Sequence, residues 1–338
     1  MSIHALDPTD PVAMAAWHAA YVAADTHGRA HPTPWALEEL RADLTGGRTG
    51  ERTLAFALDA DGVEGPAACG IVELPMKENL STSYGHVLVP PDQRRRGYGT
   101  VMLDHVLDVA RGHGRARMVA SVHTPYDGPA DGSGHPDRDW AARRGFELDI
   151  SNVVRLLDLP VPDERLEELA AQAAPHHRDY TLRRFSGPIP DDIAEEFGRL
   201  VGTLMVEAPT GQVEREHEVM DLERIRSDEA VFEAAGRVKY TTVAVAPDGE
   251  LAAYTELVVP RYDPGHVYQW GTLVLPAHRG HRLGLATKVH NLRWLQQEAP
   301  DRTALMTFNA EVNAHMVAIN EALGFRPVER EVELVRSL

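Results

Sequence analysis

The stretch QRRRGYGT, residues 93–100, joins a short apolar run, Val87-Leu88-Val89, to a segment with apolar side chains at helical spacing, residues 97–114. A turn that opens a helix directs free backbone N–H groups and the positive end of the helix dipole towards one place. Arginines add paired donors for phosphate oxygens, and glycines let the backbone approach a ligand closely. The stretch therefore predicts a binding site for a pyrophosphate group.

The order of expected elements occurs twice along the chain. In the second half an apolar strand ends at Pro276, a basic turn follows at 281–286, and a helix is expected over 283–299. Aligning the two turns pairs Gly97 with Gly284, an offset of 187 residues. A repeat of this length predicts a duplicated domain. We expect domains at residues 1–160 and 179–338, joined by a linker at 161–178.

Two other phosphate-binding motifs are absent from these turns. The dinucleotide fingerprint needs G-x-G-x-x-G after the first strand of a βαβ unit, and residues 97–99 supply only G-x-G after several expected strands. The P-loop needs a lysine and a hydroxyl residue directly after its second glycine, which neither turn has.

Composition narrows the class of protein. The 338 residues carry a net charge of −17, which argues against a nucleic-acid partner and favours a cationic acceptor. The single cysteine, Cys69, excludes an intramolecular disulfide and a cysteine-rich zinc site, and no other pattern predicts a metal. The N-terminus lacks the pattern of a signal peptide, and no apolar run is long enough for a membrane helix. We expect a cytoplasmic protein with no membrane partner.

With these elements in view, the chain resembles the GNAT superfamily of N-acetyltransferases. Arg94-x-x-Gly97-x-Gly99 fits the family's R/Q-x-x-G-x-G/A motif, and His281-x-x-Gly284-x-Ala286 fits it with histidine in the first position. A short helix ending in Gly-Phe, at Gly145 and at Gly324, closes each copy. The arrangement is similar to tandem-domain GNAT enzymes of the actinobacterial type, such as mycothiol synthase.

The resemblance implies an α+β fold class, with two tandem GNAT folds. Each would contain a mixed, mostly antiparallel sheet, splayed between its two central strands and flanked by helices. It also implies acetyl-CoA or another acyl-CoA as donor, with the pyrophosphate in the turn and the pantetheine arm along the strand before it. The implied donor-binding residues are Val87, Leu88, Val89, Arg94, Arg95, Arg96, Gly97, Tyr98, Gly99 and Thr100 in the first copy, and Leu273, Val274, Leu275, His281, Arg282, Leu283, Gly284, Leu285, Ala286 and Asn313 in the second.

The implied reaction is direct attack of a neutral amine on the thioester, which needs a base, oxyanion donors and an acid. Many GNAT enzymes carry the acid as a tyrosine four residues before the Gly of Gly-Phe, where this chain has Ala141 and Asn320. The glutamate base of some members would match about Ser83 and Gln269. The substitutes considered are Glu207, Glu256, Tyr268 and His266, and Asn320 at the tyrosine position. Packed or solvated structural roles are the alternative for each.

The second domain has the longer acceptor segment, residues 206–230, so we expect it to be catalytic, with the first binding acyl-CoA or serving as a scaffold. The expected function is transfer of an acyl group, acetyl first, to an amine of a small molecule, in antibiotic modification or specialised metabolism. Three alternatives stay open: a donor carried by an acyl carrier protein, a non-catalytic acyl-CoA-binding or regulatory module, and a protein-acetylating enzyme.

Overall fold

A computed structural model describes residues 1–338, and the chain divides into two compact units. The first unit contains Met1–Ser151, Gly211–Val213 and Glu329–Leu338, and the second contains Asn152–Thr210 and Glu214–Val328. None of the helices combines the length and the apolar character needed to cross a membrane. Neither unit is one continuous segment, because a short piece of the middle of the chain and its last strand join the first unit.

The first unit contains a mixed sheet in the order β1-β2-β3-β4-β5-β12. All neighbours are antiparallel except β4 and β5, which are parallel. The strands are β1 (Ser2–Ala5), β2 (Glu51–Asp59), β3 (Ala68–Pro75), β4 (Thr82–Leu88), β5 (Arg117–Pro125) and β12 (Arg326–Ser337), and the helices are α1 (Pro11–Asp25), α2 (Leu37–Thr45), the 3-10 turn η1 (Pro91–Gln93), α3 (Tyr98–Gly112) and α4 (Pro136–Ala142).

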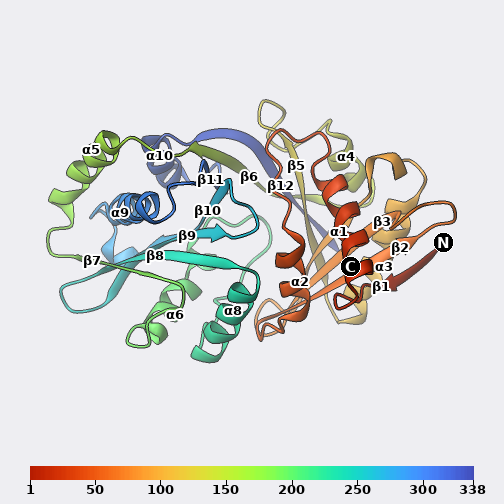
Figure 1. Ribbon diagram of the computed structural model, residues 1–338, viewed down its shortest axis with the longest axis horizontal. Helices are drawn as coiled ribbons and strands as arrows, with labels where there is room; N and C mark the ends of the chain where they lie inside the picture. The colour runs from red at the N-terminus through yellow and green to blue at the C-terminus, as the bar shows by residue number, and fades with distance from the viewer. The chain divides into compact units, whose positions relative to one another are not determined.

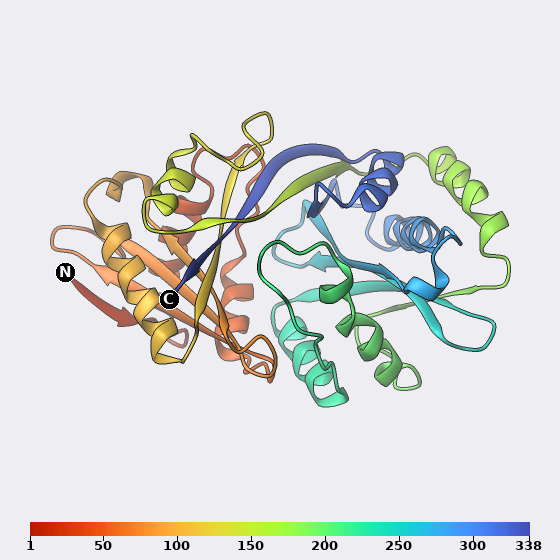
Figure 2. The same cartoon turned by 180° about the vertical axis from the view of Figure 1, so that it is seen from behind.

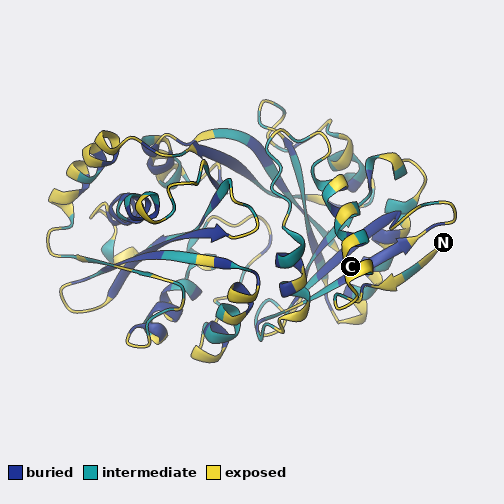
Figure 3. Ribbon diagram, in the orientation of Figure 1, coloured by how far each residue is buried: buried dark blue, intermediate teal, exposed yellow.

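Helices cover both faces of this sheet (Figures 1 and 2). On one face, Met14, Trp17 and Leu40 of α1 and α2 pack against apolar residues of β2 and β3. On the other face, Met102 and Val106 belong to an α3 stripe that packs, together with α4, against β2, β3, β5 and β12. Because both faces are covered, buried residues follow one another along the central strands, at 55–58 of β2 and 68–72 of β3 (Figure 3).

The second unit repeats this architecture with the strand order β6-β11-β10-β9-β8-β7. Here β10 and β11 are the parallel pair. The strands are β6 (Glu147–Asp158, in this unit from Asn152), β7 (Thr181–Ser186), β8 (Arg237–Val245), β9 (Leu251–Pro260), β10 (His266–Val274) and β11 (Ala304–Ala310), and the helices are α5 (Asp163–Ala173), η2 (Ala174–His176), α6 (Ala194–Gly202), α7 (Leu204–Glu207), α8 (Leu222–Ala234), η3 (Pro276–His278), α9 (Leu283–Glu298) and α10 (Ala314–Leu323).

Two helical layers enclose the second sheet. Helices α5, α9 and α10 share one apolar cluster with β9, β10 and β11. On the opposite face, Phe197 and Leu200 of α6 pack against β8, β9 and β10. Leu166 and Leu169 of α5 are fully buried in the first of these clusters, so the helix expected in the linker is part of the core of the second unit.

The parallel strands diverge in both units. In the first, β4 and β5 pair only from Thr82 to Tyr84, although β4 continues to Leu88. In the second, β10 and β11 pair only from His266 to Tyr268, although β10 continues to Val274. Each sheet is therefore splayed between its two central strands, as the family resemblance implied.

The final strands occupy unexpected places. From Glu329 onward β12 pairs with β5 in the first unit, and the part of β6 from Asn152 pairs with β11 in the second unit. Each unit thus receives its last strand from the other copy of the repeat. The expected domains at 1–160 and 179–338 describe the sequence repeat and stay a prediction. The compact units differ from them, because β12 from Glu329 belongs to the first unit and β6 from Asn152 belongs to the second.

Candidate functional site

The first basic turn has the backbone of an open anion-binding loop. Arg95 and Gly97 adopt left-handed conformations, with φ of 64° and 90°, and Gly97 directly precedes α3. The N–H groups of Tyr98 and Gly99 are the first of the helix and have no acceptor within it. The side chains of Arg95 and Arg96 are exposed and make no hydrogen bond or ion pair. Two cations and a helix N-terminus are therefore free at this turn.

Packing fixes the turn between the strand end and α4. A Cβ added at Gly99 would lie 3.3 Å from Val89 and 3.5 Å from Trp140. The Arg94 Nε donates to the Val89 carbonyl at 3.2 Å. Arg144 stacks 4.0 Å above the Trp140 ring and donates to the Thr100 hydroxyl at 2.6 Å. Glycine at position 99 lets the helix start lie directly on the end of β4, as the motif requires.

The second turn has the same backbone, but with a different alignment from the one expected. Arg279 has φ and ψ of −68° and 156°, matching −64° and 158° at Arg94, and each directly follows a 3-10 turn. Arg282, with φ of 51°, precedes α9 as Gly97 precedes α3. A Cβ at Gly284 would meet Ile319 and Val274, just as one at Gly99 would meet Trp140 and Val89.

The expected pairing of Gly97 with Gly284 is therefore wrong, because Gly284 is the counterpart of Gly99 at an offset of 185 residues. The motif of the second copy is Arg279-x-x-Arg282-x-Gly284, with arginine in the first position. The alignment expected from the sequence, His281-x-x-Gly284-x-Ala286, compared residue types alone. The backbone conformations pair His281 with Arg96 instead. Ala286 lies buried inside α9.

Contacts within the second unit occupy the side chains of the second turn. Arg279 donates to the Glu207 carboxylate at 2.6 Å. His281 contacts the His176 carbonyl at 3.0 Å, and Arg282 donates to the Gln172 carbonyl at 3.4 Å. The basic groups that would meet a phosphate are thus already bound to a carboxylate and to carbonyls of α5 and η2. This is the opposite of the first turn, where Arg95 and Arg96 are free.

A β-bulge distinguishes the diverging strand of the second unit. Gln269 pairs with Leu257 and Thr272 with Thr255, so Trp270 and Gly271 together face the single residue Glu256. The Gln269 side chain donates to the Glu256 carbonyl at 2.7 Å, across the irregular part of the ladder. In the first unit β3 and β4 pair without interruption. Extra unpaired backbone groups at the point of divergence are thus a feature of the second unit.

Two proposed carboxylate bases have cationic partners. Glu207 is bound to Arg279, as described above. Glu256 is buried and lies 3.1 Å from the Lys239 ammonium, which also sits 4.6 Å from the centre of the Phe232 ring. The carboxylate of each residue is therefore already engaged by a cation. Neither residue is arranged as a free base.

Tyr268 and His266 belong to one cluster at the start of β10. The Tyr268 hydroxyl donates to Asp263 at 2.8 Å, and the His266 Nδ1 lies 2.8 Å from the same carboxylate. Burial acts to raise the pKa of Asp263, but the hydrogen bonds from His266 and Tyr268 lower it overall. The same hydrogen bond raises the pKa of His266. The Tyr268 hydroxyl proton is therefore used in a hydrogen bond to a carboxylate. This arrangement indicates a structural role for Tyr268 and His266.

Asn320 lies fully buried in a chain of polar groups. Its carbonyl accepts a hydrogen bond from Lys288 at 2.8 Å, and its amide donates to Asn309 at 3.1 Å. Arg155 donates to the same Asn309 oxygen. Burial lowers the pKa of Lys288 to about 7. Asn320, which has no acidic proton, is thus held in place by both of its amide atoms.

Two further sequence predictions have different outcomes. Asn313 is the N-cap of α10 and accepts from the Met316 N–H at 3.2 Å, which is a structural role. In the first unit, Val87 and Val89 pack on the α3 side of the sheet, while Leu88 packs on the α1 side. Beyond Tyr84 all three face no partner on β5. The edge along which the donor's arm would bind is therefore open to pairing.

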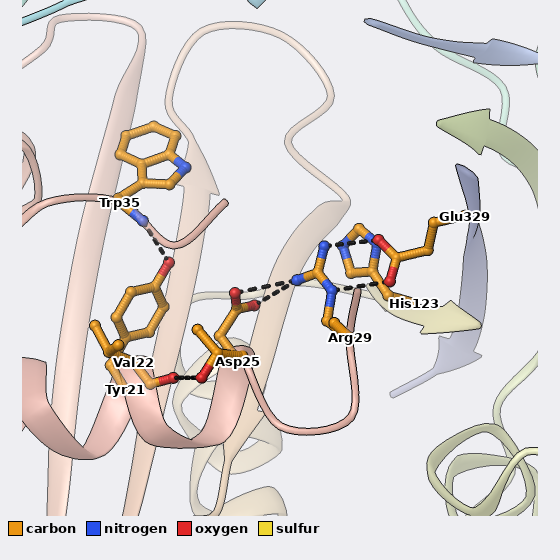
Figure 4. A network of polar contacts seen from close by, with 8 residues as sticks. Tyr21, Val22, Asp25, Arg29, Trp35, His123 and Glu329 are labelled. Carbon is orange, nitrogen blue, oxygen red and sulfur yellow. Dashed lines mark hydrogen bonds and ion pairs between the residues drawn. The ribbon is translucent and has the colours of Figure 1, made fainter. Parts of the chain in front are cut away.

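The sequence missed a polar network in the first unit that is formed by residues distant along the chain (Figure 4). Arg29, in the segment after α1, donates to Glu329 at 2.8 and 3.0 Å and to Asp25 at 3.0 Å. The His123 Nδ1 lies 3.1 Å from Glu329. Burial acts to raise the pKa of Glu329, but contacts with His123 and Arg29 lower it overall. No local motif could reveal a network whose carboxylate comes from the final strand.

His86 was also missed, and it lies on β4 just beyond the last residue paired with β5. It is half-buried and makes no hydrogen bond. Burial lowers its pKa, while the nearby charge of Glu331 acts to raise it.

On β3, burial and the nearby Asp43 raise the pKa of Glu73 to about 7. No group of three or more His, Cys, Asp or Glu side chains is arranged to hold a metal ion.

Comparisons with known proteins agree with this geometry. Residues 15–131 match the Acetyltransferase (GNAT) family. A tandem GNAT protein from the clavulanic acid biosynthesis pathway has a similar fold, with a TM-score of 0.78 and 24% identity over 99% of this chain and 98% of that one. No curated protein matches the chain by sequence.

Two more distant solved structures share the fold. A GCN5-related N-acetyltransferase from Sphaerobacter thermophilus has a TM-score of 0.63 and 15% identity, over 99% of this chain and 95% of that one. A GCN5-related glucosamine N-acetyltransferase region of a fungal multi-domain β-N-acetylglucosaminidase also has a TM-score of 0.63, with 13% identity, over 98% of this chain and 38% of that one. These similarities concern the fold of both units.

Proposed function

We propose that the protein transfers an acyl group, acetyl first, from coenzyme A to an amine of a small molecule, because residues 15–131 match the Acetyltransferase (GNAT) family and both units share the fold of a tandem GNAT protein. GNAT proteins use acyl-CoA donors. A neighbour from the clavulanic acid pathway supports a place in specialised metabolism or antibiotic modification. The glucosamine N-acetyltransferase neighbour supports a small amine as acceptor.

We assign donor binding to the first unit, and one observation carries this assignment. The turn before α3 combines free N–H groups with two unpartnered arginines, Arg95 and Arg96, directly after an open strand edge. In the second turn Gly280 takes the place of Arg95, and the side chains of Arg279, His281 and Arg282 are bound within the second unit. The expectation that the second domain is catalytic stays a hypothesis, and these contacts favour the first unit for both binding and transfer.

Substitutions with glutamate at one equivalent position of the two turns test the assignment. Arg96→Glu and His281→Glu change the same position of the two turns, and both side chains are exposed. Because a carboxylate repels the pyrophosphate, we expect Arg96→Glu to weaken acetyl-CoA binding at least tenfold and His281→Glu to change it less than threefold. Isothermal titration calorimetry measures the affinity, and thiol release with a panel of amines measures turnover. A larger effect of His281→Glu would assign the donor to the second unit.

A non-catalytic acyl-CoA-binding module is the second candidate. It is favoured by the acid position of each copy, where Ala141 is buried and Asn320 is held by two hydrogen bonds. Tight binding of acetyl-CoA without turnover of any amine would support this candidate. A donor attached to a carrier protein would need the strand edge but not the basic turn, so its turnover would survive Arg96→Glu.

A further inference from the structure

The side chain of His86 lies where the two central strands of the first unit separate. Strand β4 leaves β5 after the pair formed by Tyr84 and Val119, and His86 is two residues further along. Residues 87 and 89 of β4 pack on the α3 side of the sheet. Because side chains alternate along a strand, His86 lies on the opposite face, which α1 and α2 cover.

Polar groups of three other elements face His86 on that side of the sheet. They are Asp25 of α1, His123 of β5 and Glu331 of β12. His123 and Glu331 are cross-strand partners in the ladder between β5 and β12. Val332 and Leu334 point to the α3 side, so the alternate residues Glu329, Glu331 and Glu333 point towards α1 and α2.

The side chain of His86 makes no hydrogen bond, whereas its neighbours Asp25 and His123 contact other charged groups. Asp25 and Glu329 are neutralised by Arg29, and His123 lies against Glu329. His86 and Glu331 make no hydrogen bond, and both are only half-buried. A neutral imidazole with a carboxylate nearby can accept a proton and keep the resulting charge stabilised.

We propose that His86 is the general base of acyl transfer in the first unit, and that Glu331 of the final strand is its positioning residue. The proposal rests on the proposed function. In the reaction, the amine nitrogen forms a bond to the thioester carbonyl carbon and the carbon–sulfur bond breaks. The amine proton passes to a ring nitrogen of His86, and the thiolate leaves and takes a proton from water. The final strand, distant in sequence, thus completes the site.

His86→Gln is the direct test, because glutamine keeps the size and polarity but cannot accept the proton. We expect thiol release with the best amine of the panel to fall about 100-fold or more, the usual range for general-base catalysis. The affinity for acetyl-CoA, measured by calorimetry, should change less than threefold. His113→Gln is the control, because His113 is exposed at the end of α3, outside the site.

The pH profile separates a base from a merely structural histidine. Because burial lowers the pKa of His86, we expect kcat/KM of the wild type to rise with pH through an inflection below 6.5 and then level off. His86→Gln should lack this inflection. Glu331→Gln removes the charge that raises the pKa of His86, so the inflection should move to lower pH. A profile unchanged in both variants would overturn the proposal.

Failure of the base assignment can be distinguished from failure of the proposed function. If the wild type acylates an amine and His86→Gln keeps more than a third of that rate, the assignment of His86 is wrong and the acyltransferase stands. If the wild type binds acetyl-CoA but acylates no amine, the proposed function is wrong and the base assignment is overturned with it.

Discussion

At the scale of single residues, the two basic turns share their backbone conformation but differ in which residue types adopt it. The left-handed positions are filled by Arg95 and Gly97 in the first turn and by Gly280 and Arg282 in the second. Glycine and arginine have thus exchanged places on the same backbone. An alignment of glycines could find the repeat but not its register, because the property shared by the two copies is the backbone angle.

Residue chemistry near β4 was predictable only in part. The motif Arg94-x-x-Gly97-x-Gly99 is local, so it can be read from the sequence, and the structure places it in an open turn. The Arg29–Glu329 pair joins residues 300 positions apart, which no spacing rule connects. The substitutes proposed in the second half were chosen by residue type. Their partners, Arg279, Lys239 and Asp263, could be found only in the folded chain.

Glu329→Gln should make the first unit less stable at neutral pH, because Arg29 and His123 lose a buried anion. Breaking such a pair costs about 3–5 kcal/mol when a partner is left uncompensated, and Asp25 reduces that cost here by keeping Arg29 paired. We expect a loss of about 1–3 kcal/mol at pH 7, measured by denaturant unfolding followed through hydrogen exchange of residues 1–151.

The sign of the pH effect follows from the lowered pKa of Glu329. An ionised carboxylate with a lowered folded-state pKa stabilises the fold above its unfolded pKa, about 4.3, and that stability disappears as the pH falls through the folded value. The wild type and Glu329→Gln should therefore converge in stability below about pH 4. A difference that stays constant from pH 7 to pH 3 would contradict this account.

At the scale of elements, one inserted residue explains the change in register between the copies. Tyr84 and Tyr268 are the last paired residues of the two diverging strands, an offset of 184, whereas Gly99 and Gly284 differ by 185. The extra residue is the bulge at Trp270 and Gly271. The strands themselves were predicted from their apolar runs, but a bulge leaves no signal in such a run.

Gly271→Ala tests whether the bulge depends on glycine. A Cβ there would overlap the Tyr254 hydroxyl and lie 2.8 Å from its ring carbon Cε2. Tyr254 is almost fully buried between β9 and α6, so it has little room to move. We expect the second unit to lose about 1–3 kcal/mol of stability, as for other overpacked sites, measured by denaturant unfolding.

Gly265→Ala is the matched control in the same unit. Its added Cβ would have only one neighbour, the Thr303 hydroxyl at 3.7 Å, and the backbone needs no positive φ. Its stability should stay within about 0.5 kcal/mol of the wild type, as for most substitutions away from special sites. Equal stability of the two variants would show that Tyr254 moves away without cost.

At the scale of the whole molecule, the exchange of final strands was the part of the fold hidden from the sequence. The repeated order of strand, basic turn and helix is present in both units, and each sheet is splayed as the family resemblance implied, whereas β1 and α8 were not predicted. A strand at the end of a repeat carries the same apolar alternation whichever sheet it joins, so the pattern of 326–337 could not identify its partner. In the structure this strand pairs with β5 along nine residues, from Glu329 to Ser337.

Leu334→Ala should therefore destabilise the first unit, although residue 334 lies in the second half of the sequence. Leu334 is fully buried among side chains of α3 and β5. Removing its side chain should cost about 2–5 kcal/mol. Hydrogen exchange should speed up in β5 and α3 and stay unchanged in β11. Val312→Ala, at an exposed site, should change neither. Faster exchange confined to β11 would mean that the last strand stabilises the second unit.

The position of β12 at the end of the chain also delays folding of the first unit during synthesis. Arg330 bonds to Tyr126, 204 residues earlier, so β5 must wait for its neighbour while the whole intervening segment is made. At about 5–20 residues per second, that delay lasts roughly 10–40 seconds. During this time the edge of β5 is unpaired and open to other strands. A ribosome translating this chain therefore holds an unfinished first unit until nearly all of the second has emerged.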